Sequence, residues 1–167
     1  MPPTRPVTGA SIASVWGQQV HDFTFAPAGC TVSGGAVTML AGDAYRDLPI
    51  DTAVDDPGGY ADVGANRLEI PTDGDGLYLI VLWCSSDDGD AGDETGVVLR
   101  VNSTEVARAQ VGNEGSTVVT LGVTCLEDLS VGDLISVRAR QIGGGADASV
   151  HIRRLSIVRV GAELGAP

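Results

Sequence analysis

Alternating apolar and polar positions recur along the chain after residue 28 and predict short β-strands. The clearest case is the segment 134–142, where Ile135 and Val137 share one parity while Arg138 and Arg140 share the other. A strand with one face in a core and one face in water has this period of two. Gly and Asp residues between such segments are typical of tight turns. The pattern therefore predicts an all-β, antiparallel sandwich.

The segment 77–83 departs from this pattern, because all seven of its residues are apolar. A strand without alternation is expected to have both of its faces covered. The sandwich core accounts for one face, and the other needs a surface outside this fold, most simply a second copy of the chain. We therefore expect these outward side chains to be assembly contacts: Leu77, Leu79, Val81 and Trp83.

Eight or nine strands follow from the same reading, which is the number typical of a jelly roll. Asn102-Ser103 predicts a hairpin turn, and a parity switch at Arg153-Arg154 predicts a β-bulge. The segment 43–64 is rich in Asp, Pro and Gly and is interpreted as a long connection. The expected strands are 31–40, a short one at 48–52, 67–70, 77–85, 95–101, 104–111, 117–126, 134–142 and 149–160.

Residues 1–27 are expected to form an extended arm and a short helix in front of a jelly-roll domain at 28–161, with a tail at 162–167. Three prolines oppose helix within the first six residues. A helix at about 10–22 would be marginally stable alone in water. It should therefore dock on a partner, and the apolar side chains expected to make this contact are Ile12, Trp16, Val20 and Phe23.

The charge balance excludes several classes of function. The chain has 22 acidic residues, 10 arginines and no lysine, which gives a net charge of −12. Nucleic-acid binding needs a basic stripe, and none is apparent, so neither nucleic acid nor an anionic membrane is an expected partner. Apolar runs do not reach the ~18 residues of a membrane span. Three cysteines without a CxxC pair and the absence of a signal-peptide pattern favour assembly in a reducing cytoplasm. Cys84 and Cys125 are expected to be small core residues rather than partners in a disulfide.

The sequence offers little support for catalysis or for a cofactor. His21 and His151 are the only histidines, and neither accompanies a recognisable nucleophile motif. The acidic segment 87–94 could attract Ca²⁺, but its spacing does not match the twelve-residue EF-hand loop. We expect it to be an exposed loop that needs no metal, with a bound cation as the alternative. No His/Cys cluster has the spacing of a zinc site.

An ordered series of short motifs resembles the jelly-roll modules of tailed-phage virion proteins, which share the fold of tumour necrosis factor and complement globular heads. The segment 13–22 also resembles the short helix that precedes this module in structural proteins of actinobacterial phages. The motifs are NRLEIP at 66–71, GLYLI at 76–80, LRVN at 99–102, LSVGD at 129–133 and LSIVRVG at 155–161.

This resemblance implies a homotrimer located in a virion. A compact module with a short arm suits a decoration (cement) protein on the outer surface of a phage capsid, bound to the major capsid protein. The alternative is a tail-associated module that binds a receptor or glycan, for which Tyr45 and Tyr60 are the only aromatic residues in suitable loops. An enzyme such as a depolymerase would need two carboxylates in a groove, which the sequence does not place.

Overall fold

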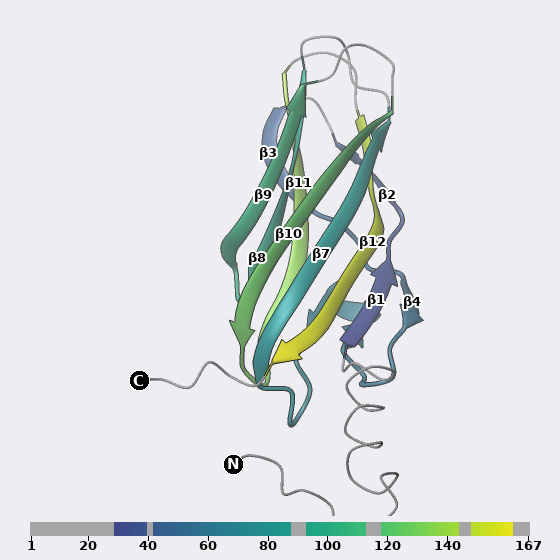
Figure 1. The fold of residues 1–167 in the computed structure, drawn as a ribbon. Helices are drawn as coiled ribbons and strands as arrows, with labels where there is room; N and C mark the ends of the chain where they lie inside the picture. Colours follow the sequence, from purple (N-terminus) through teal and green to yellow (C-terminus); the bar gives the residue numbers. More distant parts are fainter. Residues whose placement is uncertain (1–28, 40–41, 88–92, 113–117, 144–147, 162–167) are drawn as a thin grey trace, which may run out of the picture.

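The computed structural model describes residues 29–39, 42–87, 93–112, 118–143 and 148–161. In these residues, twelve strands form two six-stranded antiparallel sheets that pack face to face as a jelly-roll sandwich. Figure 1 shows the two layers, with β9 and β10 side by side where one layer passes into the other. The predicted fold class is confirmed. The expected arm, helix and tail, together with His21, lie outside the described residues.

One layer, which we call the β7 sheet, has the strand order β10-β7-β12-β1-β4, and β2 pairs with the first residues of β12. The strand β7 lies between β10 and β12 along most of its length. The bounds of the strands in this sheet are β1 Gly29–Ser33, β2 Ala36–Met39, β4 Thr52–Asp55, β7 Gly76–Asp87, β10 Val119–Leu129 and β12 Ala148–Gly161.

The other layer, the β11 sheet, has the order β5-β6-β11-β8-β9, and β3 pairs with β11. A 3₁₀ turn at Val63–Ala65 links β5 to β6. The bounds of the strands are β3 Gly42–Asp47, β5 Ala61–Asp62, β6 Arg67–Glu69, β8 Glu94–Val101, β9 Thr104–Gly112 and β11 Leu134–Ile142.

The first half of the chain is more divided than expected. The predicted strand at 31–40 is broken by Gly34 and Gly35 into β1 and β2. A Cβ atom on Gly34 would lie 1.8 Å from the carbonyl oxygen of Pro49, so the close approach of these two segments requires glycine there. The supposed long connection at 43–64 contains β3, β4 and β5. Every residue of β4 is exposed, and a strand without a buried face leaves no alternation to detect.

The turn and the bulge were correctly predicted. Asn102 and Ser103 have φ angles of 48° and 71°, the left-handed conformation that a two-residue hairpin between β8 and β9 needs. In β12, Ile152 pairs with Cys84 and Arg154 pairs with Trp83, so Arg153 is the extra residue of the bulge.

Aliphatic side chains from both sheets form the core, as expected for a chain with 4% aromatic residues. Tyr60 and Tyr78 form an edge-to-face pair within it, with ring centroids 6.2 Å apart. Cys84 is fully buried in the core and Cys125 packs at its margin, both as free thiols. The largest fully buried side chains include Met39, Leu48, Ile50, Leu68, Ile80, Leu82, Leu99, Ile135 and Ile152.

Candidate functional site

The two faces of β7 have different environments. Tyr78, Ile80 and Leu82 point into the core and are at most 1% exposed. The four predicted contact residues of β7 point to the opposite side of the sheet, where Val81 is 37% exposed and Trp83 is 50% exposed. The described part of the chain therefore covers only one face of this strand, and the other remains open as an apolar surface. The four residues are Leu77, Leu79, Val81 and Trp83.

Neighbouring strands extend this apolar surface across the sheet. Leu126 of β10 and Val158 of β12 are the register partners of Leu79, on either side of it. Leu126 is 58% exposed, and Val158 is half-buried. We call the six residues Leu77, Leu79, Val81, Trp83, Leu126 and Val158 the outer stripe. The sequence analysis did not predict Leu126 or Val158. Leu126 does carry a signal in the sequence, because it is an apolar residue at a solvent-facing position of its strand.

Polar residues border the outer stripe. Arg154 is the register partner of Trp83, and Asp128 is the partner of Leu77. Ser156 lies opposite Val81 and shares a hydrogen bond of 3.0 Å with the hydroxyl of Thr31 on β1. An apolar centre with a polar margin is the composition of a protein–protein contact surface.

Beyond Trp83 the same face of the β7 sheet becomes polar. His151 Nε2 lies 3.3 Å from Asp87 Oδ2, and Arg153 Nε donates to Ser85 Oγ at 2.7 Å. Catalytic serines are activated by a histidine that accepts their proton. Here the hydroxyl of Ser85 accepts from an arginine, and the imidazole nitrogen Nε2 faces a carboxylate. The hydrogen bond between Arg153 and Ser85 and the contact between His151 and Asp87 each join β12 to β7.

The acidic segment 87–94 differs from the expected exposed loop at both of its ends. Asp93 is 6% exposed, and its Oδ2 accepts from Nε2 of buried Gln141 at 2.9 Å. Gln141 Oε1 in turn accepts from the backbone N–H of Ala148, so Asp93 belongs to a buried network. Asp87 is half-buried beside His151. Residues 88–92 lie outside the described residues. In the described ranges, no three His, Cys, Asp or Glu side chains are grouped so that they could hold a metal ion.

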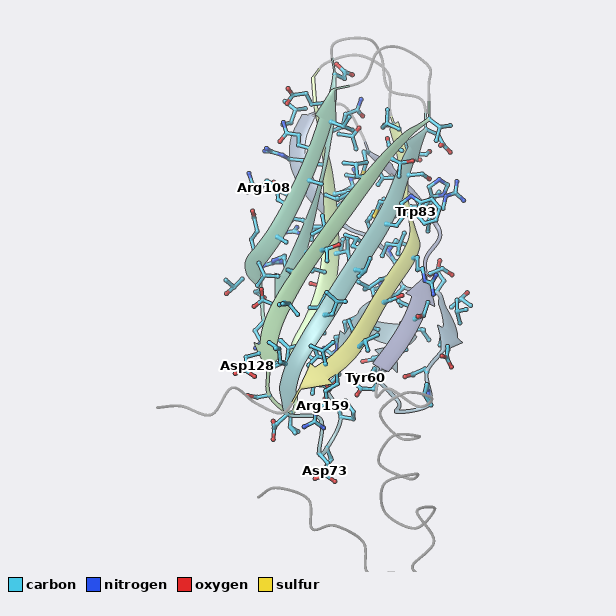
Figure 2. The ribbon with its side chains drawn as sticks, in the orientation of Figure 1. Tyr60, Asp73, Trp83, Arg108, Asp128 and Arg159 are labelled. Carbon is cyan, nitrogen blue, oxygen red and sulfur yellow. The ribbon has the colours of Figure 1, made fainter. Side chains whose placement is uncertain are left out.

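A shallow hollow at the end of the sandwich where Tyr60 lies, the lower end in Figure 2, contains the carboxylates of Asp62 and Glu69 beside Tyr60 and Val131. Arg67 occupies both, with its Nε 3.2 Å from Asp62 and its Nη2 3.5 Å from Glu69. Acid–base catalysis on a sugar needs one carboxyl with a raised pKa and one free carboxylate. Both carboxylates of this pair instead contact a single guanidinium, that of Arg67.

The thiols are not poised as nucleophiles. Burial raises the pKa of Cys84 from 9.0 to about 12. Burial raises the pKa of Cys30 to about 12 as well, with the nearby carboxylate of Asp56 acting in the same direction. Burial raises the pKa of Cys125 to about 11. Because the thiolate is the reactive form, these raised pKa values keep the three thiols protonated at neutral pH.

The described residues contain no helix that is both long and apolar enough to span a membrane.

Comparison with known proteins identifies the fold. No family model matches the sequence, and no curated protein matches it. Among solved structures, the globular domain of zebrafish complement 1qA protein is similar over 82% of this chain and 99% of its own, with a TM-score of 0.59 and 13% identity. Eiger TNF from S. frugiperda aligns over 84% of this chain and 98% of its own, with a TM-score of 0.58 and 12% identity. Murine APRIL aligns over 79% and 98%, with a TM-score of 0.56 and 12% identity. The chain has the jelly-roll fold of these domains.

Proposed function

We propose that this chain is a virion structural protein, a homotrimer that decorates the outer surface of a phage capsid. The outer stripe is the observation that carries the proposal. The outer stripe lies on the open face of β7, which is the face that the sequence predicts to be covered by a second copy of the chain. The phage location and the capsid partner rest on the resemblance of the sequence motifs to virion jelly rolls.

Physical chemistry favours covering the outer stripe. Trp83 and Leu126 alone present two large apolar side chains that are at least half exposed. Soluble monomers rarely expose a contiguous apolar patch beyond a few hundred Å². Removing apolar area from water contributes roughly 25 cal/mol per Å². A second copy of the same chain can supply the covering surface. Three copies close a ring if the outer stripe of each subunit packs against a different part of the next subunit.

Attachment to a capsid is proposed to use the N-terminal segment rather than the sandwich. Ile12, Trp16, Val20 and Phe23 repeat at helical spacing and give that segment an apolar face. A trimer would present three such segments to one capsid region. Three linked contacts bind with greater strength than one, because the second and third form at high effective concentration.

The mass of the purified protein in solution tests the assembly step. At micromolar concentration, light scattering coupled to gel filtration should give three times the 17.1 kDa chain mass. A stable monomer would overturn the proposed role of the outer stripe. Capsid attachment is tested separately, by mixing the protein with undecorated particles and measuring the bound copies after sedimentation.

A further inference from the structure

Three of the ten arginines of this acidic chain lie on the outer face of the β11 sheet. Arg138 and Arg140 lie two residues apart on β11, and their register partners on the neighbouring strand β8 are Val98 and Gly96. On the far side of β8, Arg108 of β9 is the register partner of Val98. Arg108, Arg138 and Arg140 therefore stand close together on one surface, although the chain as a whole carries a net charge of −12.

Two of these guanidinium groups are fixed in place. Arg138 Nε lies 2.9 Å from Asp47 Oδ1, and its Nη2 donates to the carbonyl oxygen of Tyr45 at 3.1 Å. Arg108 is held by both carboxylate oxygens of Glu105, at 2.7 and 2.6 Å. Between them, Val98 is only 4% exposed although it lies outside the core cluster, and Arg138 and Arg108 are its register partners on either side.

Arg140 is the arginine of this group that is held least tightly, although the Glu105 carboxylate that binds Arg108 also attracts it. In the described residues, no carboxylate forms an ion pair with it at 4 Å or less. Its guanidinium carbon lies 5.0 Å from the centre of the Tyr45 ring, and that of Arg138 lies 5.7 Å from the same centre. Gly96 of β8 is the register partner of Arg140, and a Cβ atom there would lie 3.8 Å from Cγ of Arg140, so the Arg140 side chain lies over this glycine. We call Tyr45, Arg108, Arg138 and Arg140 the arginine face.

We propose that the arginine face binds a polysaccharide that carries carboxylate groups, such as a uronic-acid polymer. A guanidinium forms two parallel hydrogen bonds with a carboxylate. The Tyr45 ring, with an arginine on it, adds an apolar edge against which a sugar ring can pack. The backbone positions of Arg138 and Arg140 are about 7 Å apart along the strand, and that of Arg108 is about 10 Å away across two strand spacings. Arginines at separated backbone positions suit a polymer that carries separated carboxylates.

The negative net charge of the chain favours a carboxylated glycan over nucleic acid as the polyanion bound by the arginine face. Nucleic acid carries a charge on every phosphate and would be repelled by an acidic protein over most of its length. A carboxylated glycan has one charge per one or two sugars, so a small positive surface can hold it without a large repulsive term. The arginine face and the outer stripe are on different sheets. Figure 2 shows Arg108 and Trp83 at opposite margins of the sandwich.

Binding to immobilised polygalacturonate tests this proposal, with the full-length protein as analyte and neutral dextran as reference. We expect binding to polygalacturonate, little to dextran, and weakening as NaCl is raised. Arg140→Gln should reduce affinity at least about tenfold, which is ~1.4 kcal/mol. Tyr45→Ala should also reduce it, and Arg140→Lys should give an intermediate loss because lysine lacks the planar fork. Arg67→Gln, which removes the same charge at the other end of the molecule, should bind as the unchanged protein does.

Three outcomes would overturn the proposal. The first is equal binding of the unchanged protein to polygalacturonate and dextran. The second is an equal loss in Arg140→Gln and Arg67→Gln, which would reflect net charge alone. The third is tighter, Arg140-dependent binding to polyglutamate or duplex DNA, which would assign the face to a protein or a nucleic acid. Thermal melting of each variant checks folding, and the two Arg140 variants decide the question if Tyr45→Ala does not fold. None of these outcomes depends on the trimer.

Discussion

The hydroxyl of Tyr60 lies 3.2 Å from that of Tyr78, and the Tyr78 hydroxyl donates to the carbonyl oxygen of Gly74 at 2.6 Å. Because Tyr78 has a single proton and gives it to Gly74, Tyr60 must be the donor within the pair. The chain Tyr60–Tyr78–Gly74 therefore ties the start of β5 to the turn before β7, deep in the lower end of the core. Burial raises the pKa of Tyr78 well above its ordinary value of 10.0.

Replacing Tyr78 with Phe should destabilise the fold more than replacing Tyr60 with Phe. The first change leaves the Gly74 carbonyl and the Tyr60 hydroxyl without partners and should cost about 2–3 kcal/mol, while the second removes one donor and should cost about 1 kcal/mol. Urea denaturation of both variants gives the two free energies of unfolding. A smaller loss for Tyr78→Phe than for Tyr60→Phe would contradict this hydrogen-bond order.

Polar substitutions in the outer stripe should dissociate the assembly without unfolding the subunit. Trp83→Ser and Leu126→Ser alter side chains that are at least half exposed in the single chain, so they should shift the solution mass toward 17.1 kDa. Val131→Ser is the matched control, since Val131 is 47% exposed but lies at the lower end of the molecule, outside the stripe. The idea fails if the stripe variants keep the assembled mass, or if the control loses it.

Alkaline pH should destabilise the protein through Cys84. Its pKa is about 12 in the folded chain and near 9.0 when exposed, so the folded state favours the protonated thiol. That contribution is fully present below pH 9 and is lost as the pH rises toward 12. The loss amounts to about 1.4 kcal/mol per pH unit. Urea denaturation at pH 8, 9, 10 and 11 under reducing conditions gives the slope, which should be shallower in Cys84→Ala. An unchanged slope would show that Cys84 is not the group responsible.

Deleting residues 1–25 should abolish attachment to particles and leave the sandwich folded. The described core is built from residues after 28. Trp16→Ala in the intact chain should weaken attachment by about 2 kcal/mol, as for an aromatic hot spot. Sedimentation with particles measures occupancy, and circular dichroism checks the β-rich fold. Full occupancy by the truncated protein would move the attachment site to the sandwich.

Calcium should not change the melting temperature of the protein. At the two described ends of the acidic segment, Asp93 Oδ2 accepts from Gln141 and Asp87 Oδ2 faces His151, so each carboxylate already has one oxygen engaged within the protein. Thermal melts in 2 mM calcium and in chelator should agree within about 1 °C, given that ~1 kcal/mol moves the melting temperature by ~2–8 °C. A fall of several degrees on chelation would show that residues 87–94 hold a structural cation.

Strands with one buried face were predictable because their alternation is visible in the sequence. Residues 134–142 match β11 at both ends, and the parity switch located the bulge at Arg153. Edge strands such as β4 were missed because none of its side chains is buried. The break at Gly34 was also missed, since it depends on the carbonyl of Pro49, whose proximity is set by the tertiary fold.

The candidate surfaces were predictable to different degrees. The missing alternation in β7 pointed to Leu79, Val81 and Trp83, because an apolar residue on a solvent-facing position is a local signal. The contribution of Leu126 depended on the pairing of β10 with β7, which one sequence does not specify. The arginine face was invisible for the same reason, since Arg108 and Arg140 are 32 residues apart in sequence and are brought together only by the register of β8 with its two neighbours.

The bulge at Arg153 gives the open face of the β7 sheet a direction. On one side of the bulge the face is apolar, with Val81, Trp83 and their apolar neighbours. On the other side the face is polar, with Asp87 beside His151. A surface that was apolar throughout could be covered by a partner in either of two opposed orientations. A surface with one apolar end and one polar end accepts only one orientation, because reversing the partner would set its apolar residues against polar side chains. One inserted residue in the last strand thus marks which way round a neighbour must sit.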